Sequence, residues 1–184
     1  MLLDIDAATG LLRGVRQVLS PFFDPRPAGM TPDLIVVHNI SLPPGEFGGP
    51  WIDALFTGGL PPGRHPYFET LKGVRVSAHA LIRRDGSVTQ YVPFAQRAWH
   101  AGKSVYHGRT DCNDFSIGIE LEGTDDVPFE GAQYTTLADL IRALLAIYPT
   151  LTRESITGHS DIAPGRKTDP GPAFDWPRLR ALIA

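Results

Sequence analysis

The sequence has little of several features that mark familiar protein classes. It has one cysteine, Cys112, among 184 residues, so no intramolecular disulfide can form, whereas secreted domains of this size often carry paired cysteines. It has no run of about 18 apolar residues, the minimum for a membrane-spanning helix. Residues 1–6, MLLDID, carry acidic side chains where an export signal has a basic segment before an apolar run. We therefore expect a cytoplasmic protein without a membrane partner.

The sequence also lacks excess positive charge and several standard catalytic motifs. Its formal net charge of −3 differs from the clustered basic face of proteins that bind nucleic acid or anionic membranes. There is no Gly-rich phosphate loop, His-Glu-x-x-His, paired Cys-x-x-Cys or Gly-x-Ser-x-Gly motif. These absences weaken nucleotide-binding and serine-hydrolase hypotheses and favour a small neutral or mixed-charge ligand.

Apolar residues and turn formers are abundant instead. Hydrophobic residues make up 42% and charged residues 20% of the chain, which suits one globular domain over residues 1–184. The 19 glycines and 17 prolines exceed the usual combined share of roughly 12%. They are densest between Ser41 and Pro66, and a segment of this kind inside a compact domain is usually a functional loop.

Periodicity predicts both strands and helices, and hence an α/β domain. Strands are expected over residues 34–40, over 78–83 and 87–92 around an Asp-Gly turn, and over 116–122. Apolar spacing predicts a helix over 134–148, and a short one is possible at 51–56. A C-terminal helix is expected with Asp175 as its N-cap and Leu179, Leu182 and Ile183 as its buried stripe.

Three side chains have the composition of an open catalytic zinc site. His38, His159 and Asp169 supply two imidazoles and a carboxylate, which would leave the fourth position to water. A purely structural interpretation is also open, in which His38 is a hydrogen-bonded histidine at a strand end and Asp169 forms a turn before a proline.

Further candidate residues can also be explained by ordinary structural roles. Glu120 stands in the middle of a strand, on the face opposite the large apolar residues, where it could simply be solvated, and Glu122 competes for any catalytic role. Lys167 could solvate a loop. The segment 99–102, Trp-His-Ala-Gly, could combine packing with a turn.

Five ordered blocks decide between these alternatives. The residues 36–41 (VVHNIS), 76–79 (VSAH), 97–102 (RAWHAG), 113–120 (NDFSIGIE) and 158–164 (GHSDIAP) with 167–172 (KTDPGP) resemble the N-acetylmuramoyl-L-alanine amidase type 2 family. The resemblance covers about residues 21–176. It implies a mixed central sheet flanked by helices, with long Pro/Gly-rich loops around a zinc cleft.

The resemblance also assigns roles to individual residues. It implies that His38, His159 and Asp169 hold Zn²⁺ and that Glu120 and Lys167 are catalytic, and it does not carry over Glu122. It further implies substrate contacts by Asn39, Arg75, Trp99 and Ala163. A second arginine expected just before the cysteine is Asp111 here, and Arg109, two residues earlier, is the candidate to replace it.

The implied activity is hydrolysis of the amide between the lactyl group of N-acetylmuramic acid and L-alanine. Within the family, the resemblance is strongest to amidases of cell-wall recycling, which act on small soluble 1,6-anhydro-muramyl peptides, and we expect a monomer. Two alternatives are a non-catalytic peptidoglycan-recognition module and a general amidase acting on the intact wall. Retention of the ligands, Glu120 and Lys167 argues against the first, and the absence of an export signal argues against the second.

Overall fold

A six-stranded mixed sheet organises the computed structural model, which describes residues 3–184; the first two residues of the expected domain lie outside this part. Four strands run parallel, β7 is antiparallel to β6, and β3 is parallel to β7. The mixed sheet expected from the family resemblance is therefore confirmed. In spatial order the strands are β12 (Ile156–Gly158), β5 (Leu34–Ile40), β11 (Ser116–Glu122), β6 (Ala80–Ile82), β7 (Val88–Gln90) and β3 (Arg16–Gln17).

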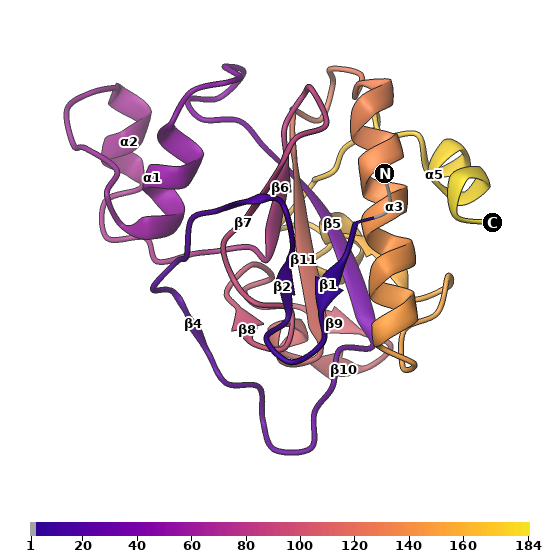
Figure 1. The fold of residues 1–184 in the computed structure, drawn as a ribbon. Coiled ribbons are helices and arrows are strands. Elements are labelled where there is room, and N and C mark those ends of the chain that lie inside the picture. Colours follow the sequence, from indigo (N-terminus) through magenta and orange to yellow (C-terminus); the bar gives the residue numbers. More distant parts are fainter. Residues whose placement is uncertain (1–2) are drawn as a thin grey trace.

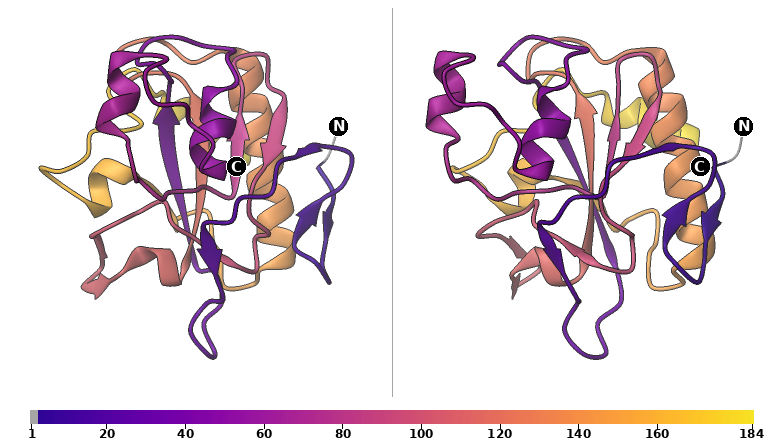
Figure 2. Two further views of the ribbon diagram at one scale, coloured as in Figure 1. Left: turned by 90° about the vertical axis from the view of Figure 1, so that its left-hand side faces the viewer. Right: turned by 60° about the vertical axis from the view of Figure 1, so that its left-hand side comes forward.

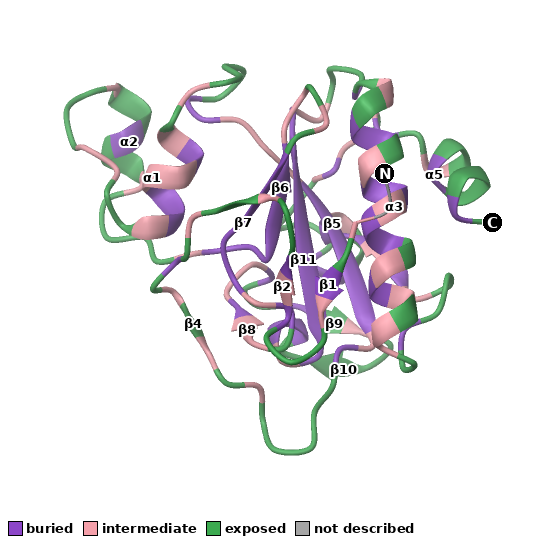
Figure 3. Ribbon diagram, in the orientation of Figure 1, coloured by how far each residue is buried: buried purple, intermediate pink, exposed green. Residues whose placement is uncertain are grey.

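The two central strands have the predicted bounds, and alternation along them separates the two faces of the sheet. Ile35 and Val37 of β5 join Ile117 and Ile119 of β11 in a core beneath the long helix α3 (Gly131–Ile147). The intervening side chains point to the opposite face, because successive residues of a strand alternate. β11 is buried along its whole length and β5 over its first five residues, as the colours of Figure 3 indicate. The face away from α3 is therefore the one on which polar side chains can gather beneath loops.

The predicted Asp-Gly hairpin is present between β6 and β7. Gly86 adopts φ 83°, and its N–H donates to the Arg83 carbonyl at 2.9 Å. The Asp85 carboxylate accepts from the Ser87 N–H at 2.9 Å. An added Cβ at Gly86 would lie 3.0 Å from Ala132, so the turn also packs closely against α3. Both conformation and space therefore favour glycine at this position.

The two predicted C-terminal helices form with adjusted bounds. Helix α3 begins at Gly131, three residues earlier than the apolar spacing indicates, because Glu130 and Gln133 form a capping box there. Asp175 caps α5 (Trp176–Ile183) by accepting from the Arg178 N–H at 2.9 Å. Leu182 is 39% exposed, so its predicted burial is wrong. Only one flank of this short helix faces the core, through Leu179 and Ile183.

Helices cover both faces of the sheet, as Figure 1 shows: α3 and α5 lie on one side, and α1 (Trp51–Thr57) and α2 (Pro66–Thr70) lie on the other. The side views of Figure 2 show the same separation. The predicted short helix at 51–56 is α1. The remaining elements are short: β1 (Ile5–Asp6), β2 (Leu11–Leu12), β4 (Phe23–Asp24), β8 (Arg97–Ala98), β9 (Val105–Tyr106), β10 (Arg109–Thr110), a 3-10 turn (Cys112–Asp114) and α4 (His159–Ile162).

Across residues 3–184, none of the helices combines the length and apolar character needed to cross a bilayer.

Candidate metal centre and active site

The site begins with two neighbouring side chains on the central strands. The parallel register of β5 and β11 places Glu120 directly beside His38. Both belong to the alternating set that points away from α3, so they lie on the same face of the sheet. Gly118, two residues before Glu120, leaves room on this face for other side chains. The sheet thus brings together two residues that are 82 positions apart in the sequence.

His159 and Asp169 complete a group of three possible ligands with His38. His159 begins α4 directly after β12, the neighbour of β5. Asp169 lies on the following loop, where its carbonyl accepts from the Ser160 N–H at 2.9 Å. His38 Nδ1 lies 3.0 Å from both His159 Nδ1 and Asp169 Oδ2, and the last two atoms are 3.1 Å apart. Three ligand atoms therefore converge on one point, as a metal site requires.

The Nε2 atoms of the two histidines, which point away from the converging atoms, each have a partner that can take a donated hydrogen bond, so each Nδ1 is free to offer a lone pair. His159 Nε2 lies 3.0 Å from the carbonyl oxygen of Ala101, which can only accept, so Nε2 carries the proton. His38 Nε2 lies 2.9 Å from His100 Nδ1, to which it can donate. Burial lowers the pKa of His38 to about 4, which favours the neutral imidazole.

Asp169 adds a negative charge to this pair. Burial alone would raise its pKa, but its contacts with His159 and His38 outweigh burial and lower it. With the ring protons on the Nε2 atoms, two imidazole nitrogens and a carboxylate oxygen thus face one another at hydrogen-bond distance. Such acceptors repel one another unless a cation lies between them. The residues present therefore fit a bound divalent metal ion.

Glu120 is a buried carboxylic acid without a full set of partners. It is 8% exposed, and its Oε2 atom has no hydrogen-bond partner among the described residues. Burial raises its pKa well above the usual value, and the nearby charge of Asp169 raises it further, while Lys167 opposes this shift. The alternative of a solvated strand face is therefore wrong. A carboxyl group with a raised pKa in a cavity is a candidate general acid or base.

Glu122 differs from Glu120 although it stands on the same strand. Glu122 is 2% exposed and accepts from Arg83 Nη1 at 2.8 Å and from the Gly48 N–H at 2.7 Å. It also accepts from the Arg84 N–H at 3.3 Å. One oxygen thus holds the loop before α1 and Arg83, and the other holds the backbone of the β6–β7 hairpin. Glu122 is a structural carboxylate.

A cavity of about 380 Å³ opens over the converging atoms. Lys167 lines it from the loop between α4 and Asp169, where its backbone N–H donates to the Ala163 carbonyl at 3.0 Å. The opposite wall is apolar and comes largely from the Pro/Gly-rich segment that begins at Ser41 and from α1 and α2. Its lining includes Ile40, Leu42, Pro44, Leu55, Phe56, Tyr67, Leu71 and Val74.

Two of the expected substrate contacts face this region. Asn39 lines the cavity, and its amide group donates to Asp125 Oδ1 at 2.7 Å and to the Pro170 carbonyl at 3.0 Å. Arg75 lines a second hollow of about 400 Å³, which shares the wall residues Leu55, Leu71 and Val74 with the first. The two hollows are therefore adjacent.

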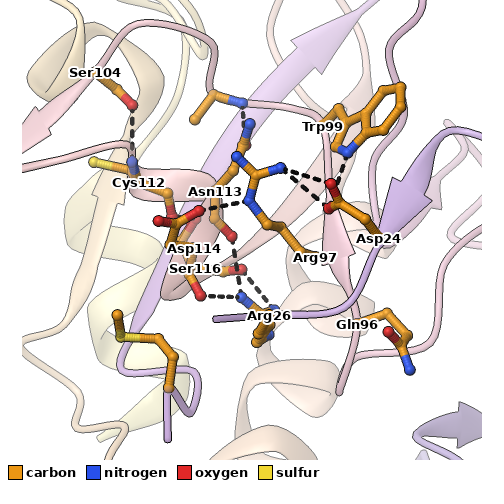
Figure 4. A network of polar contacts seen from close by, with 12 residues as sticks. Asp24, Arg26, Gln96, Arg97, Trp99, Ser104, Cys112, Asn113, Asp114 and Ser116 are labelled. Carbon is orange, nitrogen blue, oxygen red and sulfur yellow. Dashed lines mark hydrogen bonds and ion pairs between the residues drawn. The ribbon is translucent and has the colours of Figure 1, made fainter. Parts of the chain in front are cut away.

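Three other expected contacts have structural partners outside the metal cavity. The Trp99 indole donates to Asp24 Oδ1 at 3.1 Å, and Figure 4 shows this contact beside the Arg97–Asp24 ion pair. Arg109 pairs with Asp33 at 2.8 Å and lies 3.6 Å above the ring of Phe115. Ala163 ends α4 and is buried, and its carbonyl holds the loop that carries Lys167.

Reasoning from the sequence missed the residues that orient the ligands. His100 contacts His38, and the Ala101 carbonyl contacts His159. Both lie in the segment 99–102, which was interpreted as packing plus a turn, and the family resemblance assigned a substrate contact there to Trp99 alone. An available signal was the histidine within that segment, because neutral histidines commonly support other side chains through hydrogen bonds.

Comparison with known proteins agrees with this geometry. The family model for N-acetylmuramoyl-L-alanine amidase matches residues 28–172, and the chain belongs to this family. It is 63% identical over 175 residues to the 1,6-anhydro-N-acetylmuramyl-L-alanine amidase AmpD of Escherichia coli (strain K12), covering 95% of each protein.

Solved structures show the same fold. A crystal structure of a selenomethionine derivative of AmpD matches with a TM-score of 0.94 and 61% identity, covering 100% of both chains. AmpDh3 from Pseudomonas aeruginosa, solved in complex with anhydromuramic pentapeptide, matches with a TM-score of 0.59 and 28% identity. That match covers 82% of this chain and 59% of AmpDh3.

Proposed function

We propose that this protein is a zinc-dependent amidase of cell-wall recycling. It hydrolyses the amide bond between the lactyl group of 1,6-anhydro-N-acetylmuramic acid and L-alanine in soluble peptidoglycan fragments. The observation that carries this proposal is the position of Glu120, a buried acid with a free oxygen, beside three converging ligand atoms. The relatives named above support the choice of bond and substrate.

His38, His159 and Asp169 would hold the zinc ion. Two neutral imidazoles and one carboxylate are a ligand set typical of catalytic zinc, and the cavity leaves an open side. When bound, zinc supplies Lewis-acid polarisation of the carbonyl and lowers the pKa of water.

Glu120 performs the proton transfers in this mechanism. Its Oε2 atom takes the proton of the attacking water and later delivers a proton to the departing alanine nitrogen. A raised pKa suits this double role, because the group must both accept and release a proton near neutral pH. Lys167 lines the same cavity and donates a hydrogen bond to the carbonyl oxygen as that oxygen gains negative charge.

The cleft has features that suit a small muropeptide. Apolar side chains on one wall can pack against the sugar, and Arg75 in the adjacent hollow can pair with a stem-peptide carboxylate through its planar guanidinium group. We further propose that the protein acts in the cytoplasm as a monomer, where soluble fragments are its substrate.

Side-by-side kinetics test the substrate assignment. We expect kcat/KM for an anhydro-muramyl tripeptide to exceed that for the matching reducing-end muramyl tripeptide. Release of peptides from intact sacculi is the comparison that detects a general wall amidase. Equal efficiencies on the two tripeptides, or efficient digestion of sacculi, would contradict the recycling assignment.

A further inference from the structure

His100 lies directly behind the proposed metal ligand His38. Its Nδ1 atom is 2.9 Å from His38 Nε2, and the two rings meet edge to face with their centroids 5.0 Å apart. The other ring nitrogen of His100, Nε2, lies 3.0 Å from Ser116 Oγ, so both ring nitrogens have a hydrogen-bond partner. A neutral imidazole has one donor and one acceptor nitrogen, and its neighbours decide which is which.

A chain of hydrogen bonds settles that choice. Ser116 Oγ lies 2.5 Å from the Cys112 carbonyl oxygen, which can only accept, so the hydroxyl proton is used there. His100 Nε2 lies 3.0 Å from the same Oγ and must therefore be the donor in that contact. With the His100 proton on Nε2, its Nδ1 accepts from His38 Nε2, and a metal ion held at His38 Nδ1 likewise requires the His38 proton on Nε2.

We propose that His100 is a positioning residue for the metal site, which holds His38 in the tautomer that presents an unprotonated Nδ1 to the metal ion. The relay runs from the Cys112 carbonyl through Ser116 and His100 to His38. It rests on the zinc site of the proposed function, and it assigns a role to a histidine outside the ligand set. A ligand histidine whose other nitrogen is held in this way keeps its ring orientation and its basicity.

The surroundings of His100 are built to hold its ring in place. An added Cβ at Gly118 would lie 2.3 Å from His100 Cγ, so the ring rests on the bare backbone of β11. On the other side, Asn113 Oδ1 accepts from the backbone N–H of His100 at 3.1 Å and of Ala101 at 2.8 Å. The ring therefore has little freedom to turn away from His38.

Arg26 fixes the far end of the relay. Its guanidinium donates to the carbonyl oxygens of Asn113, Asp114 and Ser116 at 3.1, 3.0 and 2.9 Å, as Figure 4 shows. This partly buried cation holds the turn that carries Ser116 and Cys112. The position of His38 Nε2–H is thus determined by a connected set of contacts extending from Arg26.

Two substitutions of similar size distinguish the effect of losing the hydrogen-bond acceptor from the effect of losing the volume of the ring. In His100→Asn the amide oxygen can occupy the place of Nδ1 and accept from His38, whereas His100→Leu fills similar space without an acceptor. Zn²⁺ affinity is measured by competition with a chromophoric chelator on the metal-free protein. We expect His100→Leu to weaken Zn²⁺ binding by roughly 10- to 100-fold and His100→Asn to stay close to wild type.

Nitrogen-15 NMR of the histidines in metal-free protein gives a readout independent of activity. We expect the Nε2–H tautomer of His38 in wild type and in His100→Asn, and a loss of that tautomer in His100→Leu. A folded His100→Leu variant with wild-type affinity and tautomer would overturn the proposal, as would equal weakening by both substitutions. Failure of wild type to bind Zn²⁺ would instead contradict the proposed function, and the tautomer measurement would still test the relay.

Discussion

Separate replacement of Glu120 and Glu122 with glutamine should distinguish a residue needed for turnover from one needed for stability. The two carboxylates lie two residues apart on one strand, and both are buried. Glu120 has an oxygen with no partner, whereas Glu122 holds Arg83 and the backbone N–H groups of Gly48 and Arg84. Glutamine keeps the shape of each side chain but cannot carry the proton. We therefore expect opposite effects from the same chemical change.

The expected magnitudes follow from these contacts. Glu120→Gln should lower turnover by roughly 10²- to 10⁴-fold, the usual span for general acid–base catalysis. Its stability should be unchanged or higher, because no ion pair is lost and an uncompensated buried acid is removed. Glu122→Gln should cost about 3 kcal/mol, the low end for breaking a buried ion pair, since Arg83 keeps contacts with Gly49 and Asp53. For a chain of this length that corresponds to a fall in Tm of roughly 6–12 °C.

Steady-state kinetics on an anhydro-muramyl tripeptide and thermal unfolding of the same samples measure both effects. Zinc content, determined by elemental analysis, checks that Glu120→Gln still holds the metal. The reasoning would be refuted if Glu122→Gln lost more turnover than Glu120→Gln at a temperature where both are folded. It would also be refuted if Glu120→Gln lost its metal along with its activity.

Three further predictions concern the metal, the substrate and acid stability. His159→Ala should lose zinc and activity together, because one of three protein ligands is removed; elemental analysis after gel filtration would contradict this by finding one zinc per chain. Arg75→Ala should raise KM without changing zinc content, and Arg75→Lys should not restore it, because lysine lacks the planar fork; unchanged kinetics for either variant would rule out the contact. His79 has a folded-state pKa of about 3, lowered by burial from about 6.5, so the unfolded chain binds its proton first. The contribution of His79 to the free energy of unfolding should thus be fully present above pH 6.5 and fall by about 1.4 kcal/mol per pH unit between pH 6.5 and 3. Urea unfolding of metal-free protein measures this slope, and a slope that His79→Gln leaves unchanged would argue against it.

The central strands were predictable because their side-chain pattern is local. The apolar run at 34–40 and the strict alternation at 116–122 match β5 and β11 residue for residue. The start of α3 was harder to predict, because it is set by the reciprocal bonds of Glu130 and Gln133 rather than by apolar spacing. The strands of only two residues could not be predicted, because two residues are too few to show a periodic pattern of apolar side chains.

The site was predictable as a set of residues but not as a set of contacts. The family resemblance brought His38, His159 and Asp169 together, and the structure places their ligand atoms within 3.1 Å of one another. Local pattern could not distinguish Glu120 from Glu122, since both stand on the same face of the strand. Their difference depends on a loop and an arginine that are distant in sequence, and the relay through His100 depends on tertiary contacts in the same way.

Hydrolysis in water enriched with oxygen-18 tests the central claim most directly. If Glu120 activates water for attack on the lactyl carbonyl, one labelled oxygen must enter the new carboxylate of the anhydro-sugar and none must enter the peptide. Mass spectrometry of the products from an anhydro-muramyl tripeptide, with zinc-loaded protein and a chelator-treated control, should show this pattern only with the metal. Label in the peptide, cleavage at another bond, or equal turnover after metal removal would contradict the account.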